Sequence, residues 1–293
     1  MNVKELNAYS RFVISLFIVD ANGLERYIRH RSQYALQGSG YTSDNYYYIS
    51  GNTELSSIPN NLCHLVFDGY NTSLTNLSFA NYAFNQLESI ITGDSCFRNA
   101  SIDVVFGGMP KLKLLVIGSN CFMYAKSFLI DGLPSLETVN IGSSSFDRVQ
   151  SFRIIDCPQL SDLSIDNKCA NSTNCTAFDL VNLDSLKNIK MKYYCFSRVS
   201  SLVLHGMLSF LLANLDLPEL ETIQLGYYCF GQCKNVTFES SHFPRNDDLD
   251  LPKLKKIDSQ SLQNCKITMK SNILKNRMII RSSKFSLQYY WIS

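Results

Sequence analysis

The feature that most constrains this chain is a leucine that returns at nearly constant intervals and opens the phrase Leu-x-x-apolar each time. Eight leucines hold this position: Leu62, Leu87, Leu112, Leu136, Leu160, Leu186, Leu220 and Leu254. The intervals between them are 25, 25, 24, 24, 26, 34 and 34 residues. A fixed period of roughly 20 to 50 residues indicates a solenoid, in which one structural unit stacks on copies of itself.

A second landmark lies ten residues after the leucine, where five units carry a phenylalanine: Phe97, Phe122, Phe146, Phe196 and Phe230. Five or six residues further on, a short alternating apolar pair follows: Ile102/Val104, Phe128/Ile130, Phe152/Ile154, Leu202/Leu204 and Val236/Phe238. Side chains at positions i and i+2 of a strand point to the same side. Each unit therefore predicts two short strands with apolar side chains facing inward.

The predicted fold is mostly β: a leucine-rich-repeat solenoid of about eight turns, most of 24–26 residues and two of them longer, with two short strands per turn. Its structural columns are formed by Leu112, Leu136, Leu186, Leu220, Phe97, Phe122, Phe146, Phe196 and Phe230. Glycines follow the first strand in several units, at Gly93, Gly118, Gly142 and Gly226, where we expect a turn with positive φ. The solenoid spans residues 58–268, between an N-terminal capping region, 1–57, and a basic C-terminal cap or tail, 269–293.

The two intervals of 34 residues are interpreted as ordinary turns that carry ten-residue insertions, at about 206–216 and 240–250. The first insertion is apolar and the second is acidic. Insertions in a solenoid loop out on one face, which is often the binding face. The candidate partner-binding residues are therefore Met207, Phe210, Leu211, Asp247 and Asp248.

The phrase Leu-x-x-Val-x-Ile-Gly-x-x-x-Phe at 136–146 resembles the leucine-rich repeats of the BspA-like group. That group typically has Ala-Phe where this chain has Cys96-Phe97 and the equivalent pairs of other units. The resemblance covers about residues 58–268 and implies a non-enzymatic surface or interaction protein. The chain departs from the pattern near Ala170, where the phenylalanine is missing, and in its insertions. One stretch, Ile58 to Phe67, also resembles the FNIP-type repeat.

Ten cysteines do not indicate a disulfide framework here, because such frameworks belong to short secreted chains that lack a core. Cys96, Cys121, Cys195 and Cys229 precede the phenylalanines. They form two pairs on neighbouring turns, too far apart for one zinc site, and we expect buried thiols. Cys169 and Cys175 flank an enlarged turn and would pair in an oxidising compartment. We expect no metal site.

No nucleotide-binding, metalloprotease or hydrolase motif is present, and the four histidines fall in different units. The sequence predicts no enzyme and no cofactor. A net charge of +2 over 293 residues does not favour nucleic acid as a partner. The leading function is binding or scaffolding of a protein partner in the cytoplasm. The alternative is a cell-surface or adhesion protein that binds extracellular matrix or glycans.

The termini leave alternatives open. The apolar run from Phe12 to Val19 is too short to span a bilayer, so no transmembrane segment is predicted. It is interpreted as a buried strand or helix, with a signal peptide as the alternative. The basic residues from Lys253 to Lys284 suit a solvated cap, with contact to an anionic partner as the alternative.

Overall fold

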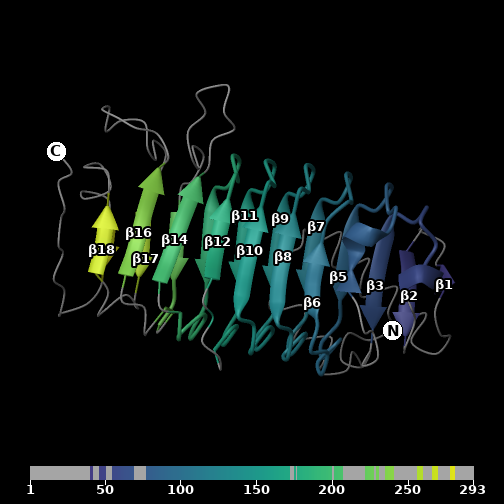
Figure 1. Ribbon diagram of the computed structural model, residues 1–293, viewed down its shortest axis with the longest axis horizontal. Helices are drawn as coiled ribbons and strands as arrows, with labels where there is room; N and C mark the ends of the chain where they lie inside the picture. Colours follow the sequence, from purple (N-terminus) through teal and green to yellow (C-terminus); the bar gives the residue numbers. More distant parts are fainter. Residues whose placement is uncertain are drawn as a thin grey trace, which may run out of the picture.

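The described part of the chain forms a coil of short, mostly parallel strands arranged in two sheets, with almost no helix among the described residues (Figure 1). This computed structural model describes residues 40–41, 46–50, 55–68, 77–171, 175, 177–199, 201–206, 222–227, 229–230, 235–240, 256–259, 266–269 and 278–280. The two sheets together form a parallel β-solenoid. Two short 3-10 segments, η2 (Leu55–Ser57) and η3 (Phe79–Asn81), lie at its N-terminal end.

Sheet A contains the first strand of each turn. Its described strands, in spatial order, are β1 (Gly40–Tyr41), β2 (Tyr46–Ser50), β3 (His64–Asp68), β5 (Ser89–Thr92), β7 (Leu114–Ile117), β9 (Thr138–Ile141), β11 (Asp162–Ile165), β13 (Asn188–Met191), β15 (Thr222–Leu225), β17 (Lys256–Ser259) and β19 (Met278–Ile280). All neighbouring pairs are parallel except β1 with β2. Sheet A therefore extends past residues 58–268 on both sides.

Sheet B contains the second strand of each turn. Its described strands, in spatial order from the N-terminal end, are β4 (Leu77–Ser78), β6 (Asp103–Phe106), β8 (Ser127–Asp131), β10 (Ser151–Ile155), β12 (Ala177–Val181), β14 (Ser201–Gly206), β16 (Asn235–Ser240) and β18 (Lys266–Met269). Each strand pairs in parallel with its equivalents in the turns before and after it. The chain thus alternates between the sheets and advances by one strand spacing per turn.

The register of both sheets places equivalent side chains next to one another. In sheet A, Leu163 is opposite Val139 on one side and Ile189 on the other. In sheet B, Phe152 is opposite both Phe128 and Phe178. All of these side chains are buried between the two sheets. Because one strand spacing is about 4.8 Å, equivalent apolar side chains meet at van der Waals distance along the whole coil.

In one turn, the inward apolar pair predicted for the second strand is wrong by two residues. The sequence pattern assigned Ile102 and Val104 to the inward face, but the inward pair of β6 is Val104 and Phe106. The register aligns Val104 with Phe128 and Phe106 with Ile130. Val104 follows Phe97 by seven residues, whereas Phe128 follows Phe122 by six, so the expected offset of five or six residues selected Ile102 instead of Val104.

The role predicted for the glycines after the first strand is also wrong. Gly118, Gly142 and Gly226 do not take positive φ; the described glycines that do are Gly108 and Gly132, which follow sheet B. A Cβ added at Gly118 would lie 2.5 Å from the main-chain oxygen of Gly93, and one at Gly142 would lie 2.6 Å from the carbonyl carbon of Gly118. These glycines are present because consecutive turns approach one another too closely for a side chain.

Candidate functional site

The connections that follow the sheet A strands have no regular secondary structure, but their conformation repeats from turn to turn. In them, main-chain groups bond to the neighbouring turns on both sides: Phe146 N–H donates to the Cys121 oxygen (3.0 Å), and Ser144 N–H donates to the Asn167 oxygen (2.8 Å). The connections after β5, β7, β9, β11 and β13 each also contain two residues with left-handed φ, such as Ser144 (60°) and Phe146 (55°). The connections are therefore held as firmly as the strands and form a continuous edge of the solenoid.

The five phenylalanines that follow an opening leucine by ten residues lie inside this edge. The rings of Phe97 and Phe122 stack with centroids 4.9 Å apart, and those of Phe122 and Phe146 stack at 5.2 Å. Phe196 and Phe230 stack in the same way at 5.7 Å. All five rings are fully buried. The same holds for Leu112, Leu136 and Leu186, whereas Leu220 lies outside the described residues.

Ala170 occupies the place where the phenylalanine is missing. It has the same left-handed φ (50°) as the phenylalanines of the neighbouring turns, and it is fully buried. Two rings from sheet B contact Phe196 of the next turn: the centroid of Phe152 lies 5.1 Å from that of Phe196, and the centroid of Phe178 lies 4.6 Å from it. Stacking continues through this turn.

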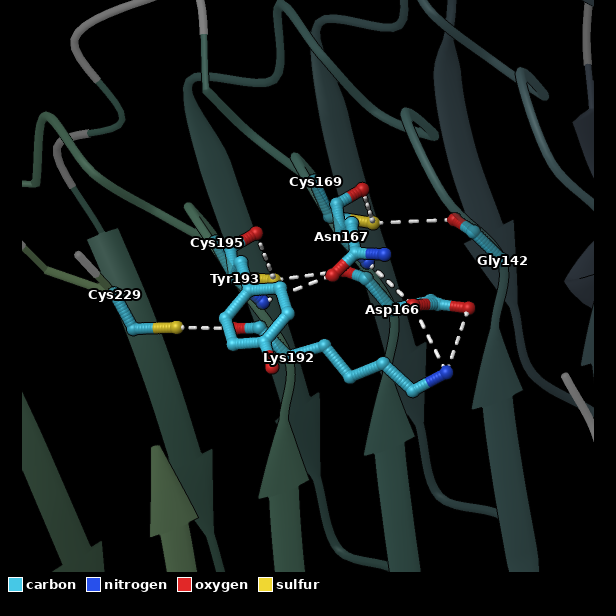
Figure 2. Close-up of polar contacts among 8 residues, drawn as sticks. All are labelled: Gly142, Asp166, Asn167, Cys169, Lys192, Tyr193, Cys195 and Cys229. Atoms are coloured by element: carbon cyan, nitrogen blue, oxygen red, sulfur yellow. Dashed lines mark hydrogen bonds and ion pairs between the residues drawn. The ribbon is translucent and has the colours of Figure 1, made fainter. Parts of the chain in front are cut away.

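A column of five thiols and one serine hydroxyl, which we call the thiol column, runs beside the phenylalanines. Its members are Cys96, Cys121, Ser145, Cys169, Cys195 and Cys229, one per turn. Each donates a hydrogen bond to a main-chain oxygen at the end of the preceding turn's first strand. The accepting residues are Phe67, Gly93, Gly118, Gly142, Asp166 and Lys192, respectively. The last three cysteines lie on consecutive turns (Figure 2).

Cys169 was not assigned to this column from the sequence, which placed it with Cys175 in an enlarged turn. The structure puts Cys169 at the column position, where its Sγ donates to the Gly142 oxygen at 3.1 Å. The eight described cysteines, Cys169 and Cys175 among them, carry thiols rather than disulfides. The signal was present in the sequence, because Cys169-Ala170 falls at the same offset as Cys195-Phe196 in the next unit.

Two of the column thiols, Cys195 and Cys229, are held in the protonated state. Burial raises the pKa of Cys195 well above its ordinary value of 9.0, and the hydrogen bond with Cys169 adds to this effect. For Cys229 the hydrogen bond with Cys195 is the main cause of a raised pKa, followed by burial. A thiol must lose its proton to act as a nucleophile or a metal ligand. Among the described residues, no three histidine, cysteine or acidic side chains are grouped in a way that would hold a metal ion.

A partly buried ion pair spans two of these turns on the outside of the column. Lys192 Nζ lies 3.2 Å from both carboxylate oxygens of Asp166, and Asp166 also accepts a hydrogen bond from Asn167 N–H (2.7 Å) (Figure 2). The Asp166 side chain is only 5% exposed, whereas that of Lys192 is 36% exposed. This ion pair links two adjacent turns. Asp166 and Lys192 stand at the position that is glycine in earlier turns, such as Gly142.

Three exposed tyrosines extend from the same edge, and we call Tyr193, Tyr194 and Tyr227 the tyrosine edge. Their exposed fractions are 54%, 39% and 47%. The rings of Tyr194 and Tyr227 meet edge to face at 5.7 Å. Their backbones are fixed, since Tyr194 N–H donates to the Tyr227 oxygen (2.9 Å) and Tyr193 N–H donates to Asn167 Oδ1 (3.0 Å).

The sequence pointed to other residues for partner binding. Met207, Phe210, Leu211, Asp247 and Asp248 all lie outside the described residues. The tyrosine edge was missed, although the phrase Tyr-Tyr-Cys-Phe occurs twice, at 193–196 and 227–230. Since cysteine and phenylalanine mark the buried columns, the two positions before them are the place to look for exposed side chains.

No protein-family model matches the chain, and no curated protein matches it either. Within the described ranges, the structure contains no helix with the length and hydropathy that a membrane crossing requires.

Proposed function

We propose that this protein is a non-enzymatic leucine-rich-repeat module, similar to the BspA-like group, that binds a protein partner through the tyrosine edge. The repeat assignment, with about eight turns, is supported by a constant offset. The strands of sheet A from β3 to β17 each begin two residues after one of the eight opening leucines. Leucine followed by a short parallel strand is the unit of such repeats.

The observation that carries the binding proposal is the exposure of large aromatic side chains on a rigid backbone. Tyr193 is more than half exposed, and Tyr194 and Tyr227 contact each other on adjacent turns. Tyrosine is enriched in protein interfaces because it offers a large contact area at a low cost in side-chain entropy and carries a hydroxyl for hydrogen bonding. Main-chain hydrogen bonds between turns already order this edge, so little further ordering is needed on binding.

Two strand residues of the same turns enlarge the surface. Lys190 of β13 and Gln224 of β15 are exposed and lie opposite each other in the sheet register. They supply a charge and a hydrogen-bonding amide three residues before Tyr193 and Tyr227 in the chain. A partner surface with acidic and apolar groups would complement this combination.

The experiment compares the capture of partners by three forms of the full chain: unchanged, Tyr193→Ala/Tyr227→Ala, and Tyr124→Ala. Tyr124 is a matched control, because it is 38% exposed but lies on an earlier turn, where Arg148 covers its ring at 4.5 Å. A partner that the unchanged chain and Tyr124→Ala retain, and that the double variant loses, supports the proposal. The loss is then measured with purified partner, and we expect Kd to rise at least tenfold. Equal retention by all three forms contradicts it.

We further propose that the protein works in a reducing compartment, as expected for a cytoplasmic protein. The support is the set of buried thiols that donate to main-chain oxygens, a role that a disulfide would abolish. Titration of thiols in protein isolated from its own cells under denaturing, non-reducing conditions tests this. Ten titratable thiols per chain are expected. Protein with oxidised cysteines would instead favour the adhesion alternative.

A further inference from the structure

One row of side chains on the outer face of sheet A changes character along the solenoid. The row consists of register partners on successive strands: Val66, Ile91, Val116, Asn140, Ser164 and Lys190. These residues alternate with the inward residues of the same strands, so they point away from the space between the sheets. Accordingly, Val66, Ile91 and Val116 are not members of the core cluster.

The exposure of this row rises from one end to the other. Val66, Ile91, Val116 and Asn140 are 0%, 7%, 2% and 6% exposed. Ser164 is half-buried and Lys190 is exposed. An uncovered sheet face would leave its central row accessible to solvent at every strand, as it is at Lys190. The first four positions are therefore beneath another part of the molecule.

The described elements do not supply this cover. The described elements that make close contact with β3, β5 and β7 are the adjacent strands of sheet A. The cover must be apolar where it meets the valines and isoleucine, and it must reach from β3 to β9. Three strand spacings amount to about 14 Å.

We propose that the N-terminal segment, residues 1–39, covers this part of the outer face and places its apolar run, Phe12 to Val19, against Val66, Ile91 and Val116. The segment leads into β1, which pairs with β2, and β2 lies directly beside β3 in sheet A. The run holds seven apolar residues in eight. It spans about 12 Å as a helix and about 26 Å as a strand, so either conformation covers most of the patch.

The composition of the row determines where this cover stops. Beyond Asn140 the outer row becomes polar at Ser164 and charged at Lys190, and burial of these groups would cost desolvation without a partner. The N-terminal segment thus occupies the face over β3 to β9. It leaves the face over β11 to β15, beside the tyrosine edge, open to a partner.

The test inserts a specific protease site between Gly38 and Gly40 of the full chain. After cleavage, the released N-terminal fragment is followed by gel filtration under native conditions. The fragment should co-elute with the remainder of the chain at the mass of one copy. In Val116→Glu, the fraction of the fragment that separates from the remainder should be at least tenfold larger than in the chain without this substitution. The matched control Ser164→Glu, in the same row beyond the covered part, should retain the fragment. Separation of the fragment from the unchanged remainder overturns the proposal, as does a remainder that elutes as a dimer, which would identify a second copy as the cover.

A second measurement does not depend on the folding of Val116→Glu. A photocrosslinking phenylalanine analogue at Leu114, at the half-buried rim of the patch, should form crosslinks within one chain to peptides from residues 1–39. The same analogue at Ser164 should not. Crosslinks from Leu114 to any other segment, or to a second chain, exclude the N-terminal segment as the cover.

Discussion

The ring of Phe178 lies edge to face against the ring of Phe196, with centroids 4.6 Å apart, although the two come from different columns of the solenoid. Phe178 belongs to sheet B, and Phe196 belongs to the phenylalanine column beside sheet A. The equivalent rings of Phe128 and Phe146 also meet at 4.6 Å, so contact between the two columns is part of the repeat. Phe152 in addition lies 5.1 Å from Phe196, so aromatic contact continues past Ala170.

Restoring the consensus phenylalanine should accordingly destabilise the protein. In Ala170→Phe the new ring would compete with Phe152 and Phe178 for the space beside Phe196, at a cost of about 1–3 kcal/mol. The free energy of unfolding in urea checks this. Ser101→Phe, at an exposed position, is the control and should change stability by less than about 0.5 kcal/mol. A gain in stability for Ala170→Phe would show that the site is not filled.

Removal of a ring from the middle of the column should have a larger effect. Phe122 stacks on Phe97 and on Phe146, so Phe122→Ala leaves a cavity lined on both sides by aromatic rings. The expected loss is about 3–5 kcal/mol, again measured by urea unfolding. Tyr124→Ala, two positions away and exposed, should lose less than about 1 kcal/mol. Similar losses in the two variants would contradict the stacked column.

The thiol column predicts a dependence of stability on alkaline pH. Folded Cys195 keeps its proton because burial raises its pKa, whereas the unfolded thiol ionises above its ordinary pKa of 9.0. The folded state thus binds more protons in this range, and the free energy of unfolding falls as pH rises above about 9. One such group contributes a slope of up to about 1.4 kcal/mol per pH unit.

Cys195→Ser isolates this contribution, because a serine hydroxyl makes the equivalent bond at Ser145, where it donates to the Gly118 oxygen at 2.8 Å. The slope of stability against pH between pH 9 and 10.5 should be shallower in Cys195→Ser than in the unchanged chain. Phe122→Leu, which removes no titratable group, should shift stability equally at both pH values. Parallel slopes for Cys195→Ser and the unchanged chain would show that the thiol ionises in the folded state as it does in the unfolded state.

The ion pair between Asp166 and Lys192 should be worth more than an exposed pair. Lys192→Met leaves the carboxylate of Asp166, which is 5% exposed, without its cation, and we expect a loss of about 1–3 kcal/mol. Arg153→Met breaks the pair with Asp179, whose side chains are 45% and 33% exposed, and should lose less than about 1 kcal/mol. Adding Asp166→Asn to Lys192→Met should recover part of the loss. The free energy of unfolding in urea is measured for the unchanged chain, the two single variants and the double variant. Equal losses in the two single variants would argue against a burial effect.

The strand order of this fold could be predicted from the sequence because a solenoid repeats one local unit. Leu136 and Leu160 begin equivalent turns, and the same backbone hydrogen bonds then place Val139 opposite Leu163. Where the repeat unit varies in length, positions predicted by counting residues along the repeat were wrong. The connection after Phe97 contains one additional residue, so the expected offset of five or six residues missed the inward pair Val104 and Phe106 and selected Ile102 and Val104.

The period of the apolar residues by itself determined that the chain forms parallel strands whose columns of leucine and phenylalanine stack, because burial of such columns depends only on equivalent positions meeting at strand spacing. Only the tertiary structure decided how the turns fit together: that Gly118 is required by the backbone of Gly93 rather than by its own φ, that Phe152 and Phe178 both contact Phe196, and that Tyr193 is exposed while Val66 is buried. These outcomes depend on distances between residues far apart in the chain, and a repeat pattern carries no information about them.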